Sequence, residues 1–256
     1  MISMSTIAAF VIAAVCTLAL PIVLLIVLGV KRKINGLPLL LGAVAFFLSQ
    51  IVLRIPMLNM LSGQSWYMDF MGYLIPFVLF LSLTAGIFEE SARLGGALIL
   101  KKRRTFKDII SFGLGHGICE AILLIGLTHI NNSVFSIAIN DTSGAMATAI
   151  GNGMLESVRP ILMAVNPFHV YLGILERFSA VVFHIFATVL VFKGVIEKKW
   201  LYYILAIAAH TVFNFASVIV GHYAGVLSSQ VVLLIMAVIA GMYVMKSNID
   251  NDSADM

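Results

Sequence analysis

The chain alternates between long apolar runs and short polar breaks, and this pattern predicts its secondary structure. A helix that crosses a bilayer needs about 20 apolar residues. Seven runs meet this length: Thr6–Val30, Leu37–Leu61, Phe70–Leu100, Phe106–Ile130, His169–Phe192, Leu201–Gly221 and Ala224–Met245. The sequence therefore predicts an all-α, polytopic transmembrane helix bundle that forms a single integral membrane domain over residues 1–256, ending in a short polar tail at 247–256.

Two stretches depart from a simple span. As one helix, Phe70–Leu100 would be about 46 Å long at 1.5 Å per residue. We expect it to tilt, to break near Gly86 or to project beyond the bilayer. The link Asn131–Asn166 begins polar and turns apolar at Ala145–Ile150 and again at Met154–Val165. For this link we expect an interfacial or re-entrant helix on the outer face, not a further crossing.

Composition and charge place the chain in the membrane. Hydrophobic residues make up 61% and charged residues 11%, against about 25% charged in soluble domains. Basic clusters flank apolar runs at Lys31–Lys33, Lys101–Arg104 and Lys198–Lys199. By the positive-inside rule, the N-terminus is expected outside and the C-terminus in the cytosol. We expect a multi-pass protein of the cell membrane, specifically a bacterial plasma membrane, with lipid as a partner.

Since no basic patch carries interleaved aromatic residues, no nucleic-acid partner is expected. Cys16 and Cys119 lie in apolar runs and predict no disulfide framework.

An acidic pair, Glu89 and Glu90, interrupts the third apolar run. Ionised carboxylates are heavily penalised in hydrocarbon, so such a pair is a candidate functional site. Arg93 follows Glu89 by four residues and Glu90 by three, which places all three on one helix face. The structural alternative is that the pair marks a cytosolic helix end that Arg93 neutralises.

Three further spans carry polar residues that need an explanation. These residues are His116 and Glu120, His184, and His210 and Asn214. Counted from the nearest basic cluster, Glu89 and His116 each lie about 18 Å into the membrane, His184 about 14 Å and His210 about 17 Å. Scattered structural residues need not share a level, whereas residues of one pocket do. The shared depth favours a single buried polar site.

Taken singly, these residues also have structural explanations. A histidine, or Asn214, can form a hydrogen bond to a neighbouring helix. Arg54 and Arg177 can serve as structural partners of Glu120 or Glu176. Glu176 and Arg177 can also neutralise each other.

The side chains at this depth are suited to activating water. A glutamate can act as general base toward a water and then protonate a leaving amine. Two or three neutral imidazoles among His116, His184 and His210 can hold Zn²⁺, which lowers the pKa of a bound water to about 7. Asn214 or a protonated His210 can donate to an oxyanion, while Arg93 orients the acidic pair. Glu120, one turn from His116, suits the fixing of that imidazole tautomer. No His-Glu-x-x-His motif of the common soluble zinc proteases occurs.

The order of these motifs resembles the YhfC family of intramembrane proteases. The motifs are Glu89-Glu90-Ser91-Ala92-Arg93, Phe112-x-x-x-His116, His184 and His210-x-x-x-Asn214. The wider group contains the CAAX prenyl-endopeptidase and bacteriocin-immunity (CPBP) proteins and the PrsW proteases. The resemblance covers residues 70–221, which it implies to be the catalytic core.

The resemblance also implies roles for the site residues. Glu89 would activate water, Glu90 and Arg93 would structure the site, and His116, His210 and Asn214 would complete it, with His184 as an extra motif. Only Ser91 and Ala92 separate the acidic pair from Arg93, whereas CAAX-type proteins commonly have three residues there, so a prenylated substrate is not implied. The resemblance leaves a zinc-dependent and a metal-free, glutamate-type mechanism open.

The predicted function is hydrolysis of peptide bonds in membrane-embedded or membrane-proximal proteins or peptides. Two other classes use similar residues. A transporter or proton relay also lines its path with Glu, His and Arg, although no paired half-repeats with broken helices are visible. A non-catalytic immunity or signalling protein would use the polar core only to fix helix packing.

Overall fold

The computed structural model describes residues 1–100 and 104–247, and no strand occurs among them. Within those ranges, seven helices are long and apolar enough to cross a membrane: Met4–Val30, Gly36–Ser62, Leu74–Leu100, Phe106–Asn140, Pro167–Ile196, Trp200–Ala224 and Val226–Lys246. The prediction of an all-α polytopic bundle with about seven spans is thus confirmed. The side of the membrane that each terminus occupies stays a prediction, and residues 248–256 of the predicted tail lie outside the described residues.

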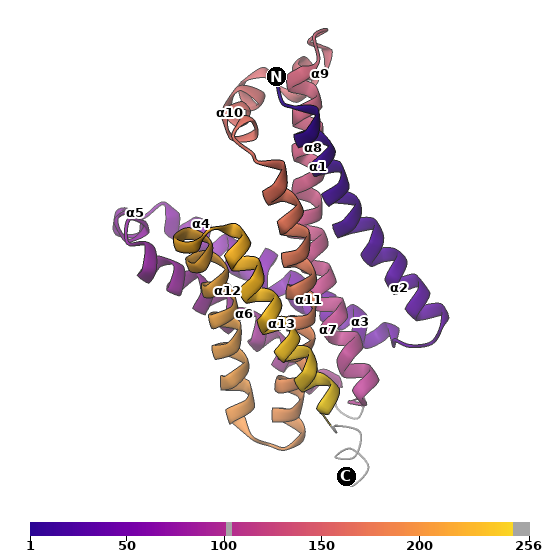
Figure 1. The fold of residues 1–256 in the computed structure, drawn as a ribbon. Helices are drawn as coiled ribbons and strands as arrows, with labels where there is room; N and C mark the ends of the chain where they lie inside the picture. The colour runs from indigo at the N-terminus through magenta and orange to yellow at the C-terminus, as the bar shows by residue number, and fades with distance from the viewer. Residues whose placement is uncertain (101–103, 248–256) are drawn as a thin grey trace. The chain divides into compact units, whose positions relative to one another are not determined.

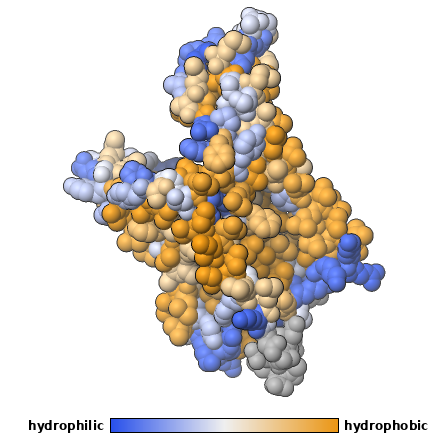
Figure 2. Space-filling view, viewed as in Figure 1, coloured by the Kyte–Doolittle hydropathy of each residue, from blue (hydrophilic) through white to orange (hydrophobic). Residues whose placement is uncertain are grey.

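The first, second and fourth spans each contain two α-helices, whereas the third is a single helix (Figure 1). The pairs are α1 (Met4–Ala14) with α2 (Leu20–Val30), α3 (Gly36–Phe46) with α4 (Ile55–Ser62), and α7 (Phe106–Glu120) with α8 (Leu127–Asn140), and the single helix is α6 (Leu74–Leu100). Where two α-helices form one span, a π-helical segment joins them: Val15–Ala19, Phe47–Arg54 or Ala121–Gly126. The last three spans are α11 (Pro167–Ile196), α12 (Trp200–Ala224) and α13 (Val226–Lys246). Apolar side chains cover most of the visible faces of α12 and α13, as lipid-facing helices require (Figure 2).

The chain forms two compact units. The first contains residues 1–24 and 121–177, and its core includes Phe10, Leu155 and Leu162. The two segments of this unit are joined by a reciprocal pair of hydrogen bonds between Ile2 and Asn140, each 2.7 Å long. The second unit contains residues 25–120 and those from 178 onward, and all the acidic and histidine residues of the predicted site fall within it. The expectation of a single domain stays a prediction.

The two irregular stretches differ in detail from the sequence prediction. Residues 70–100 are not one helix, because α5 (Ser65–Met71) ends before α6 begins at Leu74. Helix α6 then continues unbroken through Gly86, so one of the three alternatives, a break near this glycine, does not occur. A Cβ added at Gly86 would lie 3.0 Å from the carbonyl oxygen of Ile207, so the glycine permits close packing of α6 on α12.

The fourth span is longer than predicted. It does not end at Ile130 but continues to Asn140, so the first part of the supposed link is helical. Two short helices follow, α9 (Ala145–Ile150) and α10 (Asn152–Met163). Neither reaches the length of about 20 residues that a crossing needs, which agrees with the expectation of no further span. Their interfacial placement stays a prediction.

Helices α3 and α7 pack with their backbones in direct contact. A Cβ added at Gly42 would lie 2.0 Å from the carbonyl oxygen of Phe112, and one at Gly115 would lie 1.9 Å from that of Leu39. Real Cβ atoms do not approach backbone so closely, so both positions require glycine. This contact fixes the start of the second span against the helix that carries His116.

We predict that Gly42→Ala lowers the free energy of unfolding by about 1–3 kcal/mol, because the helices must separate to admit the methyl group. Gly95→Ala is the matched control, since nothing lies within 4 Å of a Cβ placed there. That substitution should be neutral or stabilise by up to about 1 kcal/mol. Unfolding by denaturant titration of the detergent-solubilised protein measures both. Equal stability of the two variants would contradict the tight contact.

Candidate active site

Four helices place six ionisable side chains together inside the second unit. Residues Glu89, Glu90 and Arg93 project from one face of α6 because they lie within four residues of each other. The imidazoles come from His116 on α7, His184 on α11 and His210 on α12. None of the six is more than 4% exposed. The structure therefore brings together residues that are far apart in sequence.

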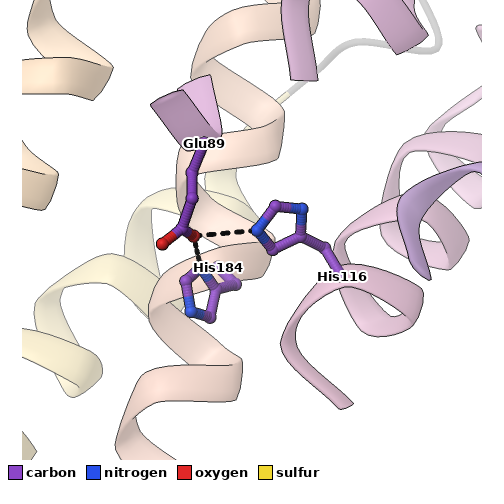
Figure 3. Close-up of side chains that lie close together, drawn as sticks. All are labelled: Glu89, His116 and His184. Atoms are coloured by element: carbon purple, nitrogen blue, oxygen red, sulfur yellow. Dashed lines mark hydrogen bonds and ion pairs between the residues drawn. The ribbon is translucent and has the colours of Figure 1, made fainter. Parts of the chain in front are cut away.

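Glu89 lies at the centre of the three imidazoles. Its Oε2 is 2.9 Å from Nε2 of His116 and 3.9 Å from Nδ1 of His184 (Figure 3). Its Oε1 is 3.7 Å from Nε2 of His210. The contact with His116 is a hydrogen bond in which Nε2–H donates to the carboxylate. Each histidine thus faces the same carboxylate from its own helix.

Arg93 also contacts Glu89, with Nη2 3.9 Å from Oε2. Gln50 is a further neighbour of Glu89, and it was not among the predicted site residues. Its Nε2 donates to Oε1 of Glu89 at 2.7 Å, and the residue is 2% exposed. The only signal in the sequence was a single amide within an apolar run. Because an uncharged amide is commonly an interhelical hydrogen bond in membrane helices, that signal did not point to the site.

Glu90 is bound by a cation and an imidazole. Its Oε1 accepts hydrogen bonds from Nη1 of Arg93 and from Nδ1 of His210, the latter at 2.7 Å. Its Oε2 is buried and has no hydrogen-bond partner among the described residues. Since Nδ1 of His210 donates to Glu90, the basic nitrogen of the neutral ring is Nε2, which faces Glu89.

The bonds of His184 determine its tautomer. Nη2 of Arg93 lies 2.6 Å from Nδ1 of His184. Because a guanidinium only donates, Nδ1 must accept and Nε2 must carry the proton. Nε2 then donates to Oε2 of Glu120. Glu120 had been expected to orient His116; the structure pairs it with His184, because α11 presents that ring to its carboxylate.

Other residues singled out from the sequence lie around this cluster. Asn214 is one helical turn beyond His210 and partly buried, and among the described residues it makes no hydrogen bond to the cluster. Arg54 bonds to Gln50, Leu81 and Thr84, so the suggested pairing with Glu120 or Glu176 is replaced by contacts within the second and third spans. In the first unit, Arg177 pairs with Glu176 at 2.5 Å, as one alternative expected.

Glu89, His116 and His184 form a set that fits a metal ion. One ligand atom from each can be chosen so that all lie within 4.8 Å of one another, and all three residues are buried. Two imidazoles and a carboxylate are a donor set typical of catalytic zinc. Binding would require two adjustments. Arg93 must leave Nδ1 of His184, and the proton of His116 must move from Nε2 to Nδ1, which has no partner among the described residues.

The fold and the site define a polytopic α-helical membrane protein with a buried carboxylate–imidazole centre. The family model described as YhfC intramembrane metalloprotease matches residues 16–239, so the chain belongs to this family. A relative named uncharacterized membrane protein YhfC, from Bacillus subtilis (strain 168), is 33% identical over 175 residues. The match covers 64% of this chain and 66% of the relative. No solved structure matches the chain. The resemblance to the YhfC family seen in the motifs is thus confirmed.

We predict that Arg93→Met lowers the free energy of unfolding by about 3–5 kcal/mol, because Glu90 loses its buried cation. Arg159→Met is a matched control, since Glu156 and Arg159 have the same spacing but side chains 66% and 35% exposed. That change should cost at most about 1 kcal/mol. Denaturant titration in detergent compares the two variants. A loss for Arg93→Met no larger than for the control would refute a stabilising role for the buried pair.

Proposed function

We propose that this protein is a zinc-dependent intramembrane endopeptidase that cleaves membrane-embedded or membrane-proximal peptide segments. The observation that supports this most directly is the grouping of Glu89, His116 and His184, buried within predicted membrane spans with ligand atoms within 4.8 Å of one another. The description of the matching family as metalloproteases agrees with it. A bacterial plasma membrane is the proposed location.

In this proposal Oε2 of Glu89, Nε2 of His116 and Nδ1 of His184 would hold the ion. When bound, zinc lowers the pKa of a water and polarises the carbonyl of the peptide. Glu120 accepts from Nε2–H of His184 and so keeps the Nδ1 lone pair directed at the site. A carboxylate behind a metal-binding imidazole fixes its tautomer and raises its basicity. Arg93, displaced from His184, keeps its bond to Glu90.

His210 is placed for proton transfer. Glu90 accepts the Nδ1 proton, so the Nε2 lone pair faces the cluster, 3.7 Å from Oε1 of Glu89. An imidazole held in this way can take a proton from water and return it to the leaving amine. We assign Asn214, one turn along the same helix, as a donor to the developing oxyanion. The two residues reach the substrate from one face of α12.

One observation favours a second candidate, a metal-free glutamate mechanism. In the structure Arg93 occupies Nδ1 of His184, and His116 donates to Glu89. In this arrangement Glu89 acts as the general base toward water, and the histidines and Asn214 stabilise the oxyanion. The two candidates share the same residues but differ in whether the purified protein contains a metal.

Metal content separates these candidates. We predict about one zinc per chain in wild type and a loss of most of it in His116→Ala and in His184→Ala, because each removes one of three protein ligands. His222→Ala is the control, since His222 is exposed and outside the cluster. Elemental analysis of the detergent-purified proteins provides the measurement. Wild type that contains no metal and takes up none at micromolar zinc would refute the zinc mechanism.

Cleavage tests the protease itself. A substrate can be found by comparing membrane proteomes of cells with and without the protein. We predict that Glu89→Gln reduces its cleavage by about 100-fold or more, since the amide can neither act as a base nor supply the charge that balances a metal. Glu156→Gln, in an exposed ion pair, should cleave as wild type. Full turnover by folded Glu89→Gln would exclude Glu89 from the reaction.

A further inference from the structure

Side chains of the second span form a series of hydrogen bonds that begins and ends at residues of α6 and reaches the site. Its π-helical segment Phe47–Arg54 contains Gln50 and Arg54. Arg54 donates from Nη2 to the carbonyl oxygen of Leu81 at 2.6 Å and from Nε to Oγ1 of Thr84 at 3.2 Å. It also donates from Nη1 to Oε1 of Gln50 at 3.0 Å, and Gln50 donates to Glu89.

The partners of Gln50 fix the orientation of its amide. Arg54 has no acceptor, so it must face the amide oxygen. The NH₂ group then faces Glu89 and donates to Oε1 of its carboxylate. Arg54 is itself hydrogen-bonded to two groups of α6, so its guanidinium cannot easily move to accommodate a flipped amide of Gln50. The network allows one amide orientation, with a donor 2.7 Å from the carboxylate.

This donor distinguishes the two oxygens of Glu89. Oε1 accepts from Gln50, while Oε2 faces His116 at 2.9 Å and His184 at 3.9 Å. Without the amide, the carboxylate could rotate about its last bond and present either oxygen, or both, to an ion. A fixed rotation leaves one oxygen for the ion and the other for Gln50.

We propose that Gln50, oriented by Arg54, is a positioning residue that makes Glu89 a one-oxygen ligand through Oε2. The proposal rests on the proposed metal site, because it concerns how Glu89 would bind the ion. Outer partners of metal ligands typically alter metal affinity by about 10–100-fold when removed. Gln50→Leu should therefore weaken binding by that factor and change the coordination geometry.

Cobalt(II) provides a test that does not depend on cleavage. Its visible absorption reports coordination number and geometry, and it commonly replaces zinc in imidazole and carboxylate sites. Metal-free wild type, Gln50→Leu and Arg54→Met are titrated with Co²⁺ in detergent. The control is Asn140→Leu, which also removes a hydrogen-bonded amide, but one that bonds to Ile2 in the first unit.

We expect Gln50→Leu to bind Co²⁺ about 10–100-fold more weakly than wild type, with shifted absorption bands. Arg54→Met should shift the bands in the same direction and by less, because the amide remains but can turn over. Asn140→Leu should keep the wild-type affinity and spectrum even if its thermal stability falls. A merely structural role for Gln50 would lower stability in Gln50→Leu as in Asn140→Leu and leave the spectrum unchanged.

The outcomes separate this inference from the proposed function. Wild-type binding and spectrum in Gln50→Leu would overturn the positioning role and leave the metal site intact. If Gln50→Leu does not fold, a wild-type spectrum in Arg54→Met overturns the role instead. Wild type that binds no Co²⁺ would overturn the metal site, and the inference with it.

Discussion

The burial of two adjacent carboxylates on α6 is the constraint on which the site unit depends. Removing one ion from water costs several kcal/mol unless partners replace the lost hydration. Each partner here comes from a different place in the fold: Gln50 from the second span, Arg93 from α6 itself, His116 from α7, His184 from α11 and His210 from α12. The helices of this unit are therefore held in register by hydrogen bonds as well as by the close backbone contact of α3 with α7.

The hydrogen bonds that stabilise the acidic pair also orient its two carboxylates differently. Oε1 of Glu90 accepts from Arg93 and from His210. Glu89 has one oxygen bound by Gln50 and the other between two imidazoles. Two adjacent residues of one helix thus have different neighbours, and the different roles proposed for them follow from this difference, which their identical chemistry does not suggest.

The sequence was sufficient to predict the spans and the meeting of Glu89 with the three histidines. Both follow from counting residues, since helix length and depth depend only on a rise of 1.5 Å per residue. It was not sufficient to assign partners. His116 and Glu120 share a helix face by their spacing, but the carboxylate contacts His184, because spacing says nothing about which helix packs against that face. Gln50 was missed because its contact with Glu89 depends on the packing of the second span against α6. The extent of α8 to Asn140 was missed because its polar residues resembled a loop.

The position of Arg93 bears directly on how a cation could bind in this cluster. Its guanidinium lies within ion-pair distance of both Glu89 and Glu90, and so it balances carboxylate charge in a region where unbalanced charge is strongly disfavoured. In the structure Arg93 lies against Nδ1 of His184, the atom proposed to bind the ion. The guanidinium and the ion cannot both occupy that nitrogen, so metal binding should be coupled to movement of Arg93 within the pocket.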